Sequence, residues 1–365
     1  MSSLTTHLSR KSDPIRAFLD ERLVDFRPAR EKWHDAQLGE PLVSEADSWQ
    51  LIGTAIDHRI RMTVARINVR NAPEANSLNY GNVSFVLSEL SSMLERHDGQ
   101  LTYLAAEEET HLLQICYLLA MYEAFDQSSY SNRRRSPLWG LQSDAKWRAH
   151  LNRIPKTDIN ALQLLVKPAL ALFTLGEPKR AIIGPRFDFG ELINSDGDFI
   201  GHLVSAEGDL IINNMLIEIK CTKPGFHASA VRQVITYSLL DFTREYKLTG
   251  CSIYLAQFGR AASWNLNELI LEVSRGRYDY DALQSDFHDF LMALIGQLER
   301  KQLASEESQR RFAAQWQDVS NATKDLINVN LFDEDGINLA RKKLIQATMS
   351  LRRLEERVGL DIHRD

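Results

Sequence analysis

Cysteine is scarce in this sequence, and long apolar runs are absent. The three cysteines, Cys116, Cys221 and Cys251, are too few and too far apart for a disulfide framework or a zinc site of paired CxxC motifs, so we interpret them as free thiols. No run of eighteen apolar residues occurs, and residues 1–18 lack the apolar core of a signal peptide. The sequence therefore predicts neither membrane insertion nor secretion, and a cytoplasmic location is expected.

Three motifs of well-known enzyme classes are also missing. HExxH, GxxxxGK[ST] and GxSxG do not occur, which leaves zinc-protease, P-loop ATPase and α/β-hydrolase interpretations without support. Internal repeats and low-complexity tracts are absent as well. What is present is an ordinary globular composition, 44% apolar and 25% charged.

Basic charge is not in excess, because the net charge is −6. Nucleic-acid binding would therefore need a local basic patch. One candidate is residues 131–156, with seven Lys or Arg against one acid and with Trp139 and Trp147 among them. Such a stretch could contact phosphates and stack on bases, or it could be a solvated connector between helices. The candidate phosphate contacts in it are Arg133, Arg134 and Arg135.

Helical periodicity dominates the first part of the chain. Ser44, with Asp47 three residues later, has the pattern of a helix start, and Pro168 lies inside a strongly apolar helical segment that it would kink. The segments predicted to be helical are 14–35, the one that starts at Ser44, 82–97, 106–127 and 157–175.

A different pattern begins at residue 186. Up to residue 258, short β-rich runs alternate with Gly, Asn and Asp turns, and a helical segment at 228–248 precedes the last run. This order of strand, strand, helix and strand requires the helix to cross over the sheet. Helical patterns return at 280–300, 303–328 and 337–358.

The predicted fold class is therefore α+β with an α/β core: a small mixed β-sheet with a crossover helix, flanked by N- and C-terminal helical regions. We divide the chain into a mainly helical region that contributes to the core (1–180), the core itself (181–275) and a C-terminal helical region (276–365).

The segment "EGDLIINNMLIEIKCTK", residues 207–223, reads as a β-hairpin. Asn213 and Asn214 tolerate positive φ and suit a two-residue type I′ turn, which pairs Ile212 with Met215 and fixes the register outward. Because successive strand residues point to opposite faces, the hairpin has one wholly apolar face that should be buried. That face consists of Leu210, Ile212, Met215, Ile217 and Ile219.

The opposite face of the hairpin carries charge. The register places Asp209 directly across from Glu218, and Glu207 across from Lys220. Like charges at opposed strand positions are destabilising unless something compensates them, and a divalent cation would do so. In the alternative interpretation, Lys220 forms ordinary ion pairs with Glu207 or Glu218 on a solvent-facing sheet surface, each worth about 0–1 kcal/mol.

The hairpin, its acid-x-Lys motif and the crossover helix together resemble the PD-(D/E)XK nuclease superfamily, in particular its RecB-like branch. Asp209 takes the place of the first acid, and Glu218 and Lys220 that of the (D/E)XK pair. Gln233 and Tyr237, spaced i, i+4, look like the Q-xxx-Y element of that branch. The likeness covers about residues 186–260, and it departs from the common pattern in having glycine, not proline, before Asp209.

The resemblance implies a restriction-endonuclease-like core and a catalytic set of Asp209, Glu218, Lys220, Gln233 and Tyr237. Mg²⁺, or Mn²⁺ in its place, would be held by Asp209, Glu218 and the carbonyl of Ile219, since Mg²⁺ prefers hard oxygen ligands. Lys220 would orient or deprotonate the attacking water. An acid of the first core helix often joins such a site, and Asp57 or His58 is the candidate here. Lys223 is a further candidate phosphate contact.

These observations lead to one main functional hypothesis, a Mg²⁺-dependent deoxyribonuclease that hydrolyses DNA phosphodiester bonds. The alternative is a non-catalytic, nuclease-derived module that binds nucleic acid or a partner protein in a defence or repair assembly. RNA is a further alternative substrate, because no residue pattern here reads a 2′-hydroxyl or a base edge.

Overall fold

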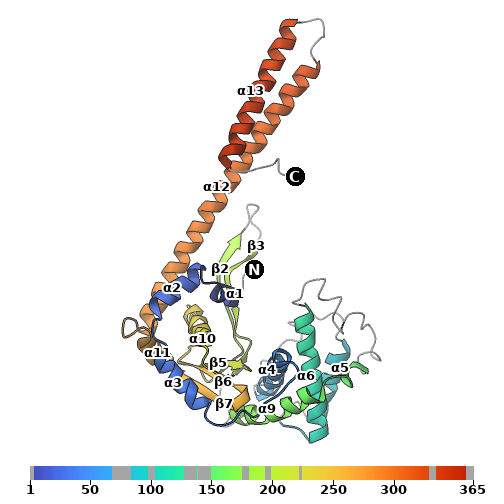
Figure 1. Ribbon diagram of the computed structural model, residues 1–365, viewed down its shortest axis with the longest axis vertical. Coiled ribbons are helices and arrows are strands. Elements are labelled where there is room, and N and C mark those ends of the chain that lie inside the picture. Colours follow the sequence, from blue (N-terminus) through green and yellow to red (C-terminus); the bar gives the residue numbers. More distant parts are fainter. Residues whose placement is uncertain are drawn as a thin grey trace. The chain divides into compact units, whose positions relative to one another are not determined.

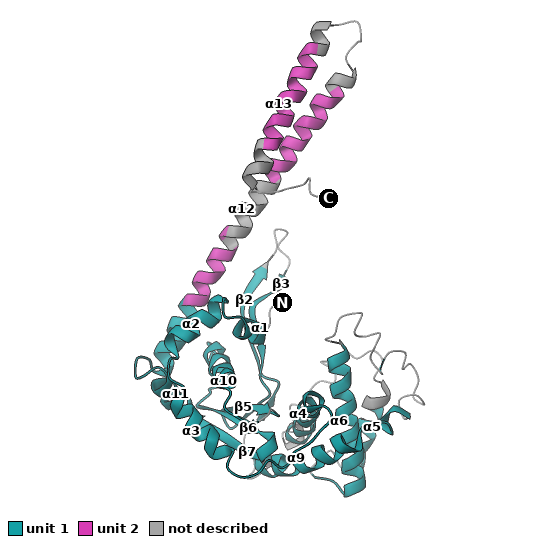
Figure 2. Cartoon of the chain, viewed as in Figure 1, with its two compact units in different colours: residues 1–289 teal, residues 290–365 magenta. Residues whose placement is uncertain are grey.

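The computed structural model describes residues 4–67, 84–97, 103–126, 138, 149–174, 181–193, 199–221, 224–328 and 334–358. The chain divides into two compact units, residues 1–289 and 290–365 (Figure 2). The boundaries expected from sequence at 180/181 and 275/276 both lie inside the first unit, and the division into three regions stays a prediction. Within the described ranges, no helix is long and apolar enough to cross a membrane.

Helices make up most of both units (Figure 1). Those within the first unit are α1 (Leu4–Ser9), α2 (Pro14–Arg22), α3 (Arg27–Ala36), α4 (Trp49–Ile67), α5 (Ser84–Arg96), α6 (Ala106–Asp126), α9 (Lys156–Thr174), α10 (Ala228–Leu240) and α11 (Leu266–Val273). Helix α12 (Tyr280–Asn328) starts in the first unit and continues into the second, where α13 (Glu334–Val358) follows it.

The first unit contains a five-stranded mixed sheet with the order β1-β4-β5-β6-β7. Strands β5 and β6 are parallel and α10 connects them, whereas the other neighbours are antiparallel. The predicted α+β class, with a mixed sheet and a crossover helix, is confirmed at this level. A separate two-stranded sheet pairs β2 with β3. The strands are β1 (Ala181–Ile183), β2 (Arg186–Ile193), β3 (Phe199–Glu207), β4 (Leu210–Ile212), β5 (Met215–Lys220), β6 (Gly250–Leu255) and β7 (Arg260–Asn265).

Both faces of the β4–β5 hairpin are covered, which explains its nearly continuous apolar sequence. The predicted apolar face, including Leu210, Ile217 and Ile219, belongs to a hydrophobic cluster with α4, α6 and α9. On the opposite face Ile211 and Leu216 are also fully buried, and α10 packs against β5 and β6. The sheet is thus a buried layer between helices, so the charged residues at its end do not lie on an open surface.

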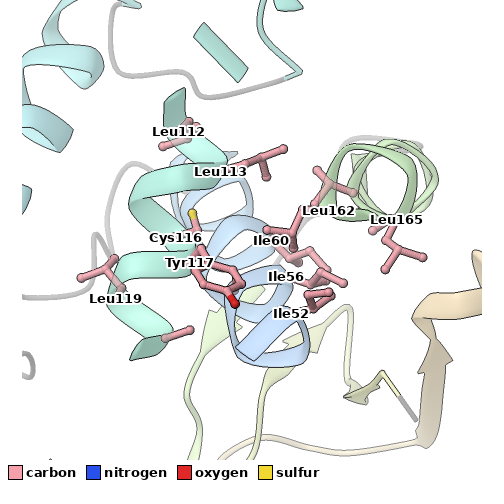
Figure 3. Close-up of a cluster of buried hydrophobic side chains, with 14 of the residues drawn as sticks. Ile52, Ile56, Ile60, Leu112, Leu113, Cys116, Tyr117, Leu119, Leu162 and Leu165 are labelled. Atoms are coloured by element: carbon pink, nitrogen blue, oxygen red, sulfur yellow. The ribbon is translucent and has the colours of Figure 1, made fainter. Parts of the chain in front are cut away.

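The cluster beside the sheet is built on α4 (Figure 3). Its Ile52, Ile56 and Ile60 recur every four residues and so present one apolar stripe to α6 and α9. Burying such side chains stabilises by about 1.5–3 kcal/mol each. Because the cluster fixes the rotation of α4 about its axis, it also decides which other face of α4 turns toward the sheet.

Two helix boundaries differ from the prediction. Residues 14–35 form two helices because the amides of Val24 and Asp25 both donate to the carbonyl of Val273, which draws the chain out of helical conformation between α2 and α3. The helix expected from Ser44 begins only at Trp49, since the amide of Asp47 is held by the side chain of Asp158.

Other differences are missed or merged elements. The helix predicted at 228–248 ends at Leu240, and the helices predicted at 280–300 and 303–328 are one continuous helix, α12. No glycine or proline separates them in the sequence, so nothing ends the helix there. Short elements β1, β7 and α11 were not predicted. In β7 the burial alternates while the sequence RAASWN has only weak apolar alternation, so its pairing depends on β6.

Candidate active site

The β4–β5 turn has the predicted conformation. Asn213 and Asn214 have φ of 49° and 67°, as a type I′ turn requires. The register is also confirmed for three pairs, from Ile212 with Met215 to Leu210 with Ile217. The ladder then stops, and the carboxylate of Asp209 accepts a hydrogen bond of 2.6 Å from the amide of Ile219. Asp209 is therefore anchored to β5 by its side chain.

A pocket of about 480 Å³ lies at this end of the hairpin. We call it the acidic pocket. It receives side chains from α4, β4–β5 and α10, elements that are far apart in the sequence. Among the charged and polar residues that line it are Asp57, Arg61, Asp209, Glu218, Lys220 and Tyr237. All the predicted catalytic residues except Gln233 therefore line one cavity.

Helix α4 contributes a second stripe to the acidic pocket. Gly53, Asp57 and Arg61 follow one another at intervals of four residues and all line it. A Cβ atom on Gly53 would lie 3.2 Å from Cβ of Cys221, so the helix passes close to the end of β5. Asp57, one of two candidates for the first-helix acid, is thus in the pocket.

The other candidate, His58, is not among the residues that line the acidic pocket. Its Nε2 lies 3.5 Å from a carboxylate oxygen of Glu123. Consecutive residues of a helix are rotated by about 100° about its axis, so their side chains point to different faces. The prediction that His58 contributes to the site is therefore not supported by its position.

Lys220 connects the hairpin to α10. Its Nζ donates to Glu218 over 2.6 Å and to the side-chain oxygen of Gln233 over 3.2 Å. The Gln233 amide in turn donates to the hydroxyl of Tyr237 over 2.6 Å. The predicted Gln233–Tyr237 pair therefore faces the acid-x-Lys motif, and it restricts the position of the ammonium group.

Arg61 and Glu123 are charged residues of the acidic pocket that the sequence patterns did not indicate. The guanidinium of Arg61 lies 2.7 Å from Asp57, 3.2 Å from Glu207 and 3.4 Å from Asp209. The expected pairing of Glu207 with Lys220 is wrong, because Glu207 still belongs to β3, where it pairs with Arg186. The i, i+4 spacing of Asp57 and Arg61 was the only sequence signal that could have drawn attention to Arg61.

Glu218 is 4% exposed, so the alternative of a solvent-facing surface ion pair does not describe it. Burial raises the pKa of Glu218, and Asp57 adds to the rise while Lys220 opposes it. Burial, followed by Glu218 and Asp57, raises the pKa of Asp209 well above its ordinary value, against the influence of Arg61. The environment thus resists the negative charge that these two carboxylates would need to bind a cation.

In the two basic groups, by contrast, the surroundings favour the charged form. Burial lowers the pKa of Lys220, but the Glu218 carboxylate outweighs it, and the net pKa is raised. The pKa of Arg61 is likewise raised, since Asp57 and Asp209 outweigh its burial. Both groups are therefore cationic at neutral pH, and they partly neutralise the acids.

The residues present fit a hard divalent cation. Oε2 of Glu218 and Oδ1 of Asp57 are buried and have no hydrogen-bond partner among the described residues. A buried carboxylate oxygen without a partner is costly, and carboxylate oxygens are the ligands that Mg²⁺ prefers. Ile219, whose carbonyl is the third predicted ligand, lines the same pocket. Among the described residues, however, no three acidic, His or Cys side chains form a ready-made cation cluster.

The predicted phosphate contacts, Arg133, Arg134, Arg135 and Lys223, all lie outside the described residues. Comparison with known proteins adds no relative: no protein-family model, no curated protein and no solved structure matches this chain. The function proposed for it therefore rests on the chemistry of its own side chains.

Proposed function

We propose that this protein is a metal-dependent nuclease of the PD-(D/E)XK type that hydrolyses DNA phosphodiester bonds. The observation that carries the proposal is the convergence of Asp57, Asp209, Glu218 and Lys220 on one pocket in which two buried carboxylate oxygens have no partner among the described residues. A buried sheet, a parallel crossover through α10 and a helix that brings an acid to the hairpin are compatible with a restriction-endonuclease-like core.

Mg²⁺ or Mn²⁺ would be held by Asp209, Glu218 and the carbonyl of Ile219, with Asp57 as a further oxygen ligand. The ion would supply Lewis acidity at a phosphoryl oxygen and acidify a water molecule. The protein's own contribution is to hold its oxygens in fixed positions: the Ile219 amide fixes Asp209, and Lys220 fixes Glu218.

Lys220 has the role of a hydrogen-bond donor and positive charge in this proposal. Its pKa is raised because of the Glu218 carboxylate, which makes it a poor base at neutral pH. Held by Glu218 and Gln233, the ammonium can orient the attacking water and offset the negative charge that develops on the phosphoryl group. Of the two roles foreseen for it, orientation is therefore favoured over deprotonation.

Arg61 would change partners when substrate arrives. Its guanidinium is shared among Asp57, Glu207 and Asp209, and a bound cation would take over the neutralisation of two of these acids. Guanidinium groups bind phosphate oxygens well because their donors match them in pairs. In this proposal, Arg61 would then contact the phosphate that is cleaved.

The second candidate function is a non-catalytic module that binds nucleic acid or a partner protein. The observation that favours it is that Arg61 and Lys220 already pair with the acids of the pocket. A site that is partly neutralised by its own side chains depends less on a bound cation. A cytoplasmic location, and DNA in preference to RNA, remain predictions under either function.

Cleavage assays with the purified full chain separate the two candidates. Single- and double-stranded DNA and single-stranded RNA are incubated with Mg²⁺ or Mn²⁺, for the natural protein, Glu218→Gln and Lys220→Ala. Glu268→Gln, an exposed acid in the first turn of α11, serves as the matched control. We expect cleavage that EDTA, Glu218→Gln and Lys220→Ala each abolish and that Glu268→Gln leaves unchanged. Binding without cleavage on every substrate would favour the non-catalytic module.

A further inference from the structure

A second, smaller pocket adjoins the acidic pocket. Its volume is about 210 Å³, and Lys220 lines both cavities. We call it the donor pocket. The residues that line it are Trp33, Lys220, His227, Ser229, Ala230 and Gln233. None of them is acidic, so the two neighbouring cavities differ in chemistry: carboxylates dominate one and hydrogen-bond donors the other.

The donor pocket is suited to a small anion. Its lining offers an ammonium group, an indole N–H, a hydroxyl, an imidazole and a carboxamide. Pockets for drug-sized ligands usually measure about 300–1,000 Å³, so this cavity matches a single compact group. Lys220 adds an ammonium group, whose Nζ is held in position by Glu218 and Gln233.

The first turn of α10, at the positive end of the helix dipole, lines the donor pocket through Ser229 and Ala230. The helix has 13 residues, its N-cap residue His227 makes no side-chain capping bond, and its first turn contains no acid. The first amides of a helix lack intrahelical acceptors and carry partial positive charge. The amide of Ala230 already donates to the carbonyl of His227 over 3.0 Å, so an anion beside Ser229 would accept from the amides that precede Ala230 in the first turn.

Trp33 provides independent support for a ligand here. Its side chain is 0% exposed, and its Nε1 has no hydrogen-bond acceptor among the described residues. Edge-on contacts with Phe226 and His227, at centroid distances of 5.5 and 5.9 Å, hold the ring in place. A buried indole N–H normally finds a partner. An acceptor bound in the cavity that Trp33 lines would be that partner.

We propose that the donor pocket binds a phosphate group of the nucleic-acid strand, beside the phosphate that is cleaved in the acidic pocket. This inference rests on the proposed nuclease function. Lys220 lines both cavities, so a phosphate held in one fixes the strand relative to the other. The bound group is an internal phosphodiester or a terminal phosphate of the strand, which share the same chemistry.

The indole N–H of Trp33 gives a direct test that needs no catalysis. The full chain, with nitrogen-labelled tryptophan and EDTA present, is titrated with inorganic phosphate and followed by NMR. Trp33→Phe assigns the signal, since it keeps an aromatic ring and removes the N–H. Trp264 is the matched control: it is 2% exposed, its Nε1 also lacks an acceptor among the described residues, and it does not line the donor pocket. We expect phosphate to shift the Trp33 signal and not that of Trp264.

Oligonucleotide binding supplies a second readout. Oligodeoxynucleotides with a phosphorylated or an unphosphorylated end are bound in EDTA to the natural protein, Trp33→Phe, Ser229→Ala and Trp264→Phe. We expect Trp33→Phe and Ser229→Ala to weaken binding by about tenfold, the effect of losing one hydrogen bond to a charged group, and Trp264→Phe to have no effect. Loss confined to the phosphorylated oligonucleotide identifies a terminal phosphate, and equal loss on both identifies an internal one.

The proposal and the nuclease function fail in different ways. In the cleavage reaction, Trp33→Phe should raise KM and leave kcat nearly unchanged, whereas Glu218→Gln abolishes cleavage but keeps the phosphate-dependent shift. Suppose that the natural protein cleaves DNA, that phosphate does not shift the Trp33 signal, and that KM is unchanged in Trp33→Phe. This result would overturn the proposal that the donor pocket binds a phosphate group. A shift at Trp33 in a protein that cleaves no substrate would refute the nuclease and leave an anion site of unassigned use.

Discussion

At the scale of single residues, the acidic pocket destabilises the folded protein. Burial, together with repulsion from neighbouring carboxylates, raises the pKa of Asp209 and of Glu218, and two carboxylate oxygens lack partners among the described residues. A buried group whose charge is unfavourable destabilises the folded state at neutral pH. Functional sites are where such arrangements are retained.

Replacing Asp209 by asparagine should therefore stabilise the protein when no metal is present. A carboxyl with a raised folded-state pKa stabilises the fold only at low pH, and this contribution is lost as pH rises through the folded-state pKa. The introduced carboxamide keeps an acceptor oxygen for the Ile219 amide. We expect Asp209→Asn to raise the free energy of unfolding in EDTA at neutral pH by about 1–2 kcal/mol, measured by urea denaturation. The gain should disappear near pH 4, and a loss of stability at neutral pH would contradict the interpretation.

Cation binding should depend on pH in the opposite direction. Only ionised carboxylates bind Mg²⁺, and the raised pKa of Asp209 and of Glu218 means that both release protons above the ordinary carboxyl range. We expect Mg²⁺ affinity to rise with pH from mildly acidic to neutral solution, with proton release on binding. Calorimetry in buffers of different ionisation heat measures both. Affinity that does not change over this range would show that these carboxyls are already ionised.

At the scale of elements, the position of α4 decides the site. Its apolar stripe packs on α6 and α9, which leaves Gly53, Asp57 and Arg61 facing the end of β5. A buried ion pair links α4 to α6: Arg59 on α4 and Glu109 on α6 form two hydrogen bonds of 2.8 Å and are 0% and 1% exposed at their side chains. The guanidinium of Arg59 also bonds to Thr63.

Breaking this pair should loosen α4 and disturb the acidic pocket. Glu109→Ala leaves the buried Arg59 charge without its carboxylate and should lower the free energy of unfolding by about 3–5 kcal/mol. The double variant Arg59→Met, Glu109→Leu removes both charges and should recover most of that loss. Chemical denaturation of the three proteins checks this order. A Glu109→Ala variant as stable as the double variant would contradict a structural role for the pair.

At the scale of the whole molecule, the pocket residues all belong to one compact unit. Both pockets are formed within residues 1–289, and the second unit, 290–365, begins inside α12. Leu283 and Phe287 of α12 are fully buried, so the first turns of this helix belong to the fold of the first unit. The catalytic apparatus proposed here needs no residue of the second unit.

A chain that ends at residue 300 should therefore keep the Mg²⁺ binding and the cleavage activity proposed for the full chain. It retains Leu283 and Phe287 of α12 and every pocket residue, so we expect unchanged Mg²⁺ binding by calorimetry and an unchanged kcat on a short oligonucleotide. Thermal unfolding first establishes that the shortened chain is folded. A folded chain that binds Mg²⁺ but no longer cleaves would show that the second unit contributes to catalysis.

Local patterns predicted a considerable part of this structure. The Asn213-Asn214 turn fixed the hairpin register, and periodicity located α6, α9, β2 and β5 closely, and α10 at its start. These features depend on residues close together in the sequence, whose geometry the backbone itself restricts. The sequence also brought Asp209, Glu218, Lys220, Gln233 and Tyr237 into one hypothesis, because three of them share a hairpin and two share a helical face.

Tertiary packing decided what local patterns could not. Arg61 lies 148 residues before Asp209 in the sequence, and only the docking of α4 against α6 and α9 turns it toward the hairpin. Glu207 pairs in β3 because the chain changes sheets at Gly208, which no alternation of side chains signals. Trp33 meets the start of α10 only in the folded chain. By itself, then, the sequence determined the hairpin and the residues on its charged face, since turn and strand geometry are local, whereas contacts between distant segments determined which charges neutralise that face.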